Sequence, residues 1–96
     1  MTDSSKNKLA SYIGLAQRAN EVLYGEDIIS ERIRLAKVVL IDSSATEKYK
    51  ERLTAKIKSC PVFTVDGLRQ ALHKDNVNAV AITNGELAKV IRDLLR

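Results

Sequence analysis

The stretch that decides the fold spans residues 15–42 and has the sequence LAQRANEVLYGEDIISERIRLAKVVLID. Within it, an apolar run at 22–24 ends at Gly25, helical spacing follows, and a second apolar run occupies residues 38–41. A glycine that opens a helix leaves backbone N–H groups exposed beside the polar side chains of the first turn. The stretch therefore predicts a strand, a turn that could hold a ligand, a helix and a buried strand. In a small basic chain, nucleic acid is the first ligand to consider.

Length and composition favour a single globular domain, residues 1–96, with a flexible lead-in at residues 1–4. The formal net charge of +4 fits a nucleic-acid or ribosomal partner, although many small proteins without such a partner are mildly basic. No apolar run approaches the roughly 18 residues of a membrane span, and the N-terminus lacks the hydrophobic core of a signal sequence. We therefore expect a cytoplasmic protein. We also expect a monomer, although no sequence feature decides the oligomeric state.

Helical and strand periodicity alternate along the chain. Helical spacing covers residues 6–18 and 26–35, and Glu26 and Asp27 in the second helix suit the positive end of its dipole. Short apolar runs predict four strands, at residues 22–24, 38–41, 62–65 and 79–82. Polar residues are predicted to begin the helices after the last three strands: Ser44 in a capping box with Glu47, Asp66, and Thr83 with Glu86.

This alternation predicts an α/β fold, a three-layer α/β/α sandwich with a mixed, mostly parallel sheet of about four strands. In such folds, ligands gather where strand ends meet helix N-termini. Three connections could share that edge of the sheet, at residues 24–27, 42–46 and 65–68.

The sequence offers no catalytic constellation. It contains neither a GxxxxGK[ST] phosphate loop nor a GxGxxG motif. Cys60, the single cysteine, excludes an internal disulfide and a multi-cysteine zinc site, and its place beside Pro61 favours partial burial. His73, the single histidine, is either a structural residue at a helix end or a loop residue that contacts phosphate or stacks on a base. We expect no enzymatic activity, cofactor or metal.

The pattern resembles a known family, the bacterial YlxQ proteins of the L-seven-Ae superfamily of ribosomal and kink-turn RNA-binding proteins. The resemblance begins with the segments GLAQRA, GEDII and AKVVLI, at residues 14–19, 25–29 and 36–41. It continues over nearly the whole chain, through residues 53–56, 61–62 and 80–83. It implies the same sandwich fold and a protein that binds structured RNA.

The resemblance also implies two contact surfaces for RNA. The first is the start of the second helix, which in the family enters the major groove at a kink; by similarity its residues are Gly25, Glu26, Asp27, Ile28 and Glu31. The family expects a lysine at the last of these positions, so Glu31 departs from the pattern. The second surface is the loop before the last strand, which packs on an unstacked base; by similarity it contains His73, Lys74, Asn76 and Val77.

Basic side chains near these segments would attract the phosphate backbone, and the candidates are Arg18, Arg32, Arg34 and Lys37. The leading hypothesis is therefore a non-enzymatic RNA-binding protein of the ribosome or its assembly machinery, which recognises a kink-turn or irregular RNA. An alternative is a protein-interaction module that kept the fold and lost specific RNA binding, because Glu26, Asp27 and Glu31 would face phosphates. A small α/β enzyme is the third hypothesis.

Overall fold

The structure is a computed structural model that describes the backbone of residues 3–96 and the side chains of residues 6–96. Over this range the chain alternates helices with short strands, and a 3-10 turn follows the second helix. The elements are α1 (Asp3–Arg18), β1 (Val22–Tyr24), α2 (Glu26–Glu31), η1 (Ile33–Leu35), β2 (Val38–Asp42), α3 (Glu47–Lys56), β3 (Val62–Val65), α4 (Leu68–Leu72), β4 (Ala79–Ile82) and α5 (Gly85–Leu95).

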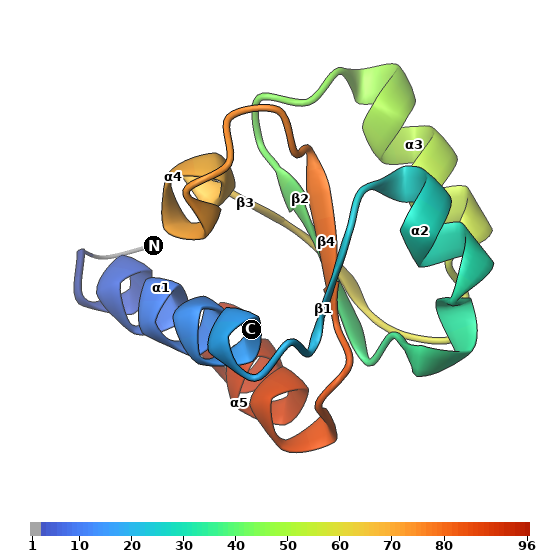
Figure 1. The fold of residues 1–96 in the computed structure, drawn as a ribbon. Helices are drawn as coiled ribbons and strands as arrows, with labels where there is room; N and C mark the ends of the chain where they lie inside the picture. The colour runs from blue at the N-terminus through green and yellow to red at the C-terminus, as the bar shows by residue number, and fades with distance from the viewer. Residues whose placement is uncertain (1–2) are drawn as a thin grey trace.

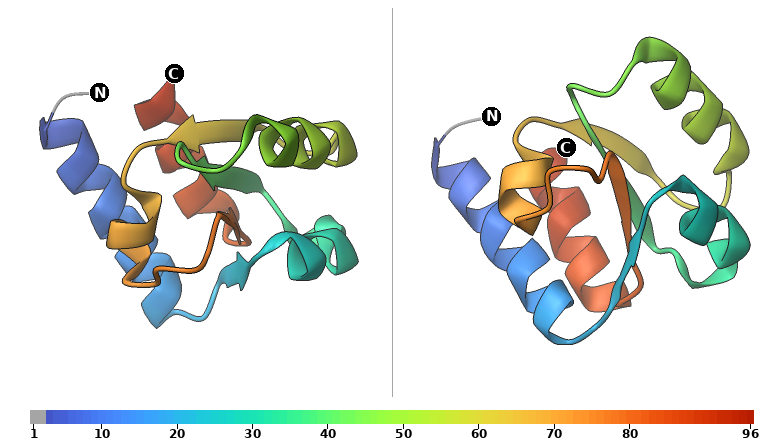
Figure 2. Two further views of the ribbon diagram at one scale, coloured as in Figure 1. Left: turned by 90° about the horizontal axis from the view of Figure 1, so that it is seen from above. Right: turned by 45° about the horizontal axis from the view of Figure 1, so that its top comes forward.

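These elements form the expected α/β/α sandwich. Helices α1, α4 and α5 cover one face of the sheet, and α2 and α3 cover the other (Figures 1 and 2). Strand β2 separates two apolar clusters because its successive side chains point to opposite faces. Leu40 packs with α1, α4 and α5, whereas Val39 and Ile41 pack with α2 and α3. Every residue of β2 is buried, as predicted for a strand covered on both faces.

The sheet is mostly antiparallel, so the prediction of a mostly parallel sheet is wrong. Its strand order is β1-β4-β2-β3, and only β2 and β3 pair in parallel. The cause lies in the connection after β3. Helix α4 has five residues and rises only about 7.5 Å, too little to cross the height of the sheet. His73 then ends α4 in the left-handed conformation, the chain turns back, and β4 runs down between β1 and β2.

Consequently, strands β1, β2 and β3 all end at the edge of the sheet where β4 begins. Three hydrogen bonds join these connections: Gly25 N to Ala79 O at 2.9 Å, Asp42 N to Asn78 O at 2.8 Å, and Ser43 N to Val65 O at 2.9 Å. We call this side of the molecule the Gly25 edge. The prediction that the three connections share one edge is confirmed, and the loop before β4 joins them there (Figure 1).

The opposite side, where β1, β2 and β3 begin and β4 leads into α5, is called the Gly85 edge. Its connections are also joined by backbone bonds. The Lys37 N–H donates to Ile82 O at 2.8 Å, and the Thr83 N–H donates to Glu21 O at 3.0 Å. Two separate surfaces therefore flank the sheet, one at each end of its strands.

All three predicted helix caps are wrong in detail. Thr46, not Ser44, caps α3 and accepts the Tyr49 N–H at 3.1 Å, because the hydroxyl of Ser44 binds Asp42 instead. Asn84, not Thr83, caps α5.

The N-cap residue of α4 is Gly67, and the side chain of Asp66 makes no cap bond there. At the other end of the chain, α1 begins at Asp3, within the predicted lead-in at 1–4. Residues 1 and 2 lie outside the described range.

Candidate nucleic-acid interface

The turn at Gly25 joins β1 to α2 at the Gly25 edge. Gly25 has φ 85° and ψ 158°, a conformation that side-chain-bearing residues rarely adopt. Its N–H binds the first residue of β4, and its carbonyl accepts the Ile29 N–H at 3.0 Å. Ile29 is fully buried and anchors α2 on the sheet. The glycine thus lets the chain reverse sharply, so that the first turn of α2 lies beside the loop that precedes β4.

Glu26 connects α2 to α3 through two cations. The Arg52 guanidinium donates to both carboxylate oxygens, at 2.8 and 2.9 Å, and Lys56 Nζ donates to Oε2 at 3.0 Å. The Glu26 side chain is 16 % exposed, whereas both partners are half exposed. The hydrogen bonds from Arg52 and Lys56 lower the pKa of Glu26 to about 2. One of the three carboxylates expected to face RNA is therefore bound by two positive charges.

The outward face of α2 carries Asp27, Ile28 and Glu31. All three are exposed, and Ile28 keeps 41 % of its surface accessible although it is apolar. Asp27 and Glu31 are four residues apart, so they lie on the same side of the helix. This face combines one apolar side chain with two acidic ones.

The loop 73–78 is held at the same edge by Tyr24. Lys74 Nζ lies 5.0 Å from the centre of the Tyr24 ring. Gln17 Nε2 donates to Tyr24 Oη at 3.2 Å and to the Leu72 carbonyl at 3.0 Å. Asn76 is exposed, whereas Val77 is partly buried and packs against the apolar cluster below. Lys74 and Asn76 therefore form the outer surface of the loop.

Asp42 organises the centre of this edge from the end of β2. It is the only charged residue among those of residues 6–96 that is buried, with 4 % of its surface exposed. Oδ1 accepts the N–H groups of Leu68 at 3.0 Å and Arg69 at 3.4 Å, and Oδ2 accepts the Ser44 N–H at 3.0 Å. Burial alone would raise the pKa of Asp42, but these donors and the Ser44 hydroxyl together lower it.

Asp42 thus supplies the cap of α4 that Asp66 was expected to supply. The Arg69 side chain, in the first turn of α4, donates to the Asn78 side chain and ties α4 to the start of β4. The Asp42 cap and the Arg69–Asn78 hydrogen bond therefore link the end of β2, the first turn of α4 and the start of β4.

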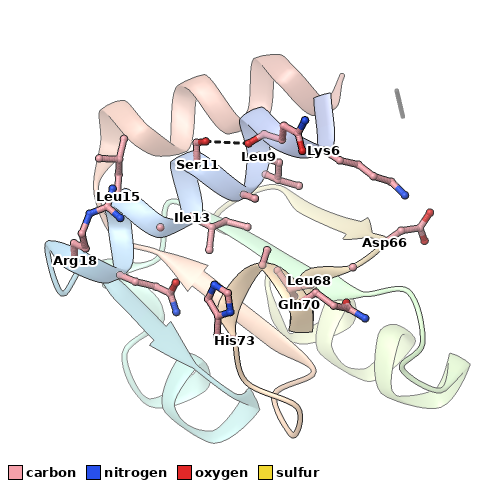
Figure 3. A pocket seen from close by; sticks show the side chains of 16 residues that line it. Lys6, Leu9, Ser11, Ile13, Leu15, Arg18, Asp66, Leu68, Gln70 and His73 are labelled. Carbon is pink, nitrogen blue, oxygen red and sulfur yellow. Dashed lines mark hydrogen bonds between the residues drawn. The ribbon is translucent and has the colours of Figure 1, made fainter. Parts of the chain in front are cut away.

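Arg18 and His73 lie apart from the Gly25 turn. They line a groove of about 960 Å³ between α1 and α4, and they lie near one end of it, with Lys6 and Asp66 at the other end (Figure 3). His73 has a left-handed backbone conformation, and its N–H donates to the carbonyls of Arg69 and Gln70. His73 is therefore the C-cap of α4. The backbone of His73 therefore has a structural role, while its side chain is exposed.

The structure does not bring Arg34 and Lys37 to the Gly25 edge. Both belong to the opposite, Gly85 edge, and they line a pocket there with the start of α5. Arg32 links α2 to η1 and is exposed between the two edges. The predicted basic residues therefore divide between three places and do not form one surface.

Sequence reasoning missed four residues of the Gly25 edge: Arg52, Lys56, Arg69 and Asp42. No local signal marks Arg52 and Lys56, because they lie among other charged residues of α3 and gain their role only through Glu26, 26 and 30 positions away. Asp42 carried a possible signal, since it is an acidic residue directly after a fully apolar strand.

In the described range, no three His, Cys, Asp or Glu residues lie close enough together to hold a metal ion. Among the helices of residues 3–96, none combines the length and the apolar character of a membrane span.

The architecture defines the class of this protein as a three-layer α/β/α sandwich with a four-stranded mixed sheet. A solved structure of a protein with unknown function from Bacillus halodurans has a similar fold. Its TM-score is 0.83 with 25 % sequence identity, and the match covers 92 % of this chain and 96 % of that chain. No protein family and no curated protein matches the sequence.

Proposed function

We propose that this protein is a non-enzymatic RNA-binding protein of the kink-turn-binding type, with the Gly25 edge as its interface. The proposal rests on one observation above all. The Gly25 N–H donates to Ala79 O at 2.9 Å, which holds the first turn of α2 beside the loop 73–78. These are the two segments that the family resemblance implies as RNA contacts. They are separated by about fifty residues in the chain, and this hydrogen bond joins the turn at Gly25 to the start of β4, directly after the loop.

The charge arrangement supports the proposal further. Glu26 would repel phosphate if it were free, but Arg52 and Lys56 bind it and leave a net charge of +1 on these three side chains (+1 +1 −1). Both cations are half exposed, so their outer surfaces remain available to a phosphate. Lys74 adds a third cation on the neighbouring loop. A cytoplasmic, ribosome-associated role and a monomeric state belong to this proposal.

The direct test compares a kink-turn RNA with a straight duplex of the same length by calorimetry at about 150 mM salt. Specific recognition requires tighter binding to the kinked RNA by at least about tenfold. A straight duplex offers neither a kink for the start of α2 nor a splayed base for the loop 73–78. Equal, weak binding to the two RNAs would reject specific recognition. Lys74→Gln should weaken the kink-turn complex, with Lys8→Gln as a matched control on the exposed surface of α1.

A protein partner is the second candidate, and the exposed face of α2 favours it. Ile28 is an apolar side chain between two carboxylates, a composition that suits a basic, partly apolar protein surface better than a phosphate backbone. In a pull-down after nuclease treatment, a partner whose capture is abolished by Ile28→Asp but retained by Lys74→Gln would favour this second function.

A further inference from the structure

The Gly85 edge carries a pocket that the proposed RNA interface does not use. It encloses about 270 Å³, a volume of roughly nine water molecules. Three segments distant in the sequence contribute to it: residues 34–37 between η1 and β2, residues 59–61 before β3, and the face of α5 that carries Gly85 and Arg92. The start of β3 and the start of α5 lie toward the same end of the sheet in Figure 1.

The pocket is strongly positive. Arg34, Lys37 and Arg92 line it, and none of its described lining residues is an aspartate or a glutamate. None of these three cations forms a salt bridge within residues 6–96. Like charges repel one another, and a negative charge close to them offsets that repulsion. Three converging cations without a protein counter-charge therefore point to an anionic ligand.

Arg92 supplies a second observation that points to a ligand. Its Nε atom is buried and has no hydrogen-bond partner among the described residues. Arg92 lies seven positions after Gly85, two helical turns along the same face of α5. Helical side chains lean toward the N-terminus, so its guanidinium extends back toward the first turn of the helix. A charged donor without an acceptor is costly, so the protein itself leaves this guanidinium incompletely paired, and an oxyanion in the pocket would bind the part of the Arg92 side chain that lines it.

The other lining groups suit an oxyanion. The Ser59 hydroxyl can donate to it, and Gly85, the first residue of α5, also lines the pocket. The next two N–H groups of α5, those of Glu86 and Leu87, bind Asn84 Oδ1 and are not available to the ligand. The Cys60 thiol adds no negative charge at neutral pH, because burial raises its pKa more than Lys37 lowers it. Glu86 follows Gly85 in the sequence but is exposed and does not line the pocket.

We propose that this pocket binds a phosphate group, held by Arg34, Lys37 and Arg92. The phosphate belongs either to a free phosphate ion or to the backbone of a nucleic-acid strand. The inference does not depend on RNA binding at the Gly25 edge, because the two surfaces lie at opposite ends of the strands.

The test uses the full chain labelled with ¹⁵N and follows its amide signals at constant ionic strength. One arm titrates inorganic phosphate, and the other titrates a short single-stranded RNA without terminal phosphate. We expect saturable shifts of the Lys37, Ser59 and Gly85 amides in at least one arm. Saturation by inorganic phosphate identifies a free-ion site, and saturation by RNA alone identifies a backbone site. Absence of saturation in both arms overturns the proposal.

Two variants with matched charge make the result specific. Lys37→Gln should weaken the affinity measured at the Ser59 and Gly85 amides by at least tenfold. Lys8→Gln on α1 should leave that affinity unchanged. Both lysines are exposed, so both variants should fold. Equal affinity in Lys37→Gln and Lys8→Gln would contradict the proposed site. The Gly25 and Asn76 amides report the other edge in the same spectra, so failure of the RNA interface would be seen separately.

Discussion

The Oδ1 atom of Asp42, at the end of β2, accepts the backbone N–H of Leu68 at 3.0 Å, across 26 positions of sequence. A strand end thus caps a helix in a different layer. The same carboxylate holds Ser44 through Oδ2, so one buried side chain fixes two connections of the Gly25 edge. The arrangement makes the short helix α4 depend on a residue outside it.

Asp42→Ala should therefore lower the free energy of unfolding by about 2–4 kcal/mol, because it leaves the buried Leu68 N–H and the partly buried Ser44 N–H without an acceptor. Urea denaturation measures the loss. Asp66→Ala is the matched control: Asp66 is exposed, and its side chain makes no cap bond to α4, so it should change stability by less than about 0.5 kcal/mol. A larger loss in Asp66→Ala than in Asp42→Ala would contradict this assignment.

Glu26→Gln should destabilise the protein at neutral pH by about 1–2 kcal/mol, since it removes the charge that binds Arg52 and Lys56 while both cations stay half exposed to solvent. The pKa of Glu26 in the folded state is about 2 against an ordinary 4.5. A lowered pKa means that the stabilisation is present above about pH 4.5 and is lost as the pH falls toward 2. The difference between wild type and variant should shrink over that interval.

The control for this ion pair is Glu47→Gln. Glu47 pairs with Lys50 at 3.3 Å, but its side chain is 82 % exposed, so the change should cost less than about 0.5 kcal/mol. Unfolding curves of both variants at pH 7 and pH 3 separate the cases. A constant Glu26→Gln deficit at both pH values would mean that packing, and not charge, causes it.

Glu31→Lys tests the outward face of α2 as an RNA surface. The substitution changes the local charge by two units and restores the lysine that the family resemblance implies. If this face contacts phosphate, affinity for a kink-turn RNA should rise by about fivefold at 150 mM salt, and the salt slope should steepen by about one. The control is Asp93→Lys at an exposed position of α5, which gives the protein the same net charge. An equal gain in both variants would indicate general attraction without a contact at Glu31.

Asn84→Ala should weaken the start of α5. The Asn84 Oδ1 atom accepts the N–H groups of Glu86 at 2.9 Å and Leu87 at 3.0 Å. Their loss should cost about 1 kcal/mol in thermal or urea unfolding. Thr83→Ala, at the cap position that the capping-box spacing suggested, should cost less than half as much, and the reverse order would contradict the observed cap.

Apolar periodicity in the sequence was sufficient to locate the main elements. The run 38–41 and the stripe of Leu9 and Ile13 each predicted an element and its buried side, because burial must follow the repeat of the strand or helix. Gly25 also marked its own turn, since its positive φ suits glycine and few other residues. For these features the information is local.

The direction of β4 and the partners of the charged residues required the tertiary structure. The alternation of elements contains no measure of whether α4 is long enough to cross the sheet, so the antiparallel insertion of β4 was missed. Glu26 has the acidic residue Asp27 beside it in the sequence, but in the structure it binds Arg52 and Lys56 of α3. Asp42 caps a helix that begins 26 residues later.

The sequence by itself determined most of the buried apolar residues and where most strands begin and end, because the hydrophobic effect acts through repeats of a few residues. Only the tertiary structure decided which charges meet, which helix each polar side chain caps, and at which edge each basic residue lies. Hydrogen bonds and ion pairs require atoms within about 3–4 Å, and that proximity depends on the path of the whole chain.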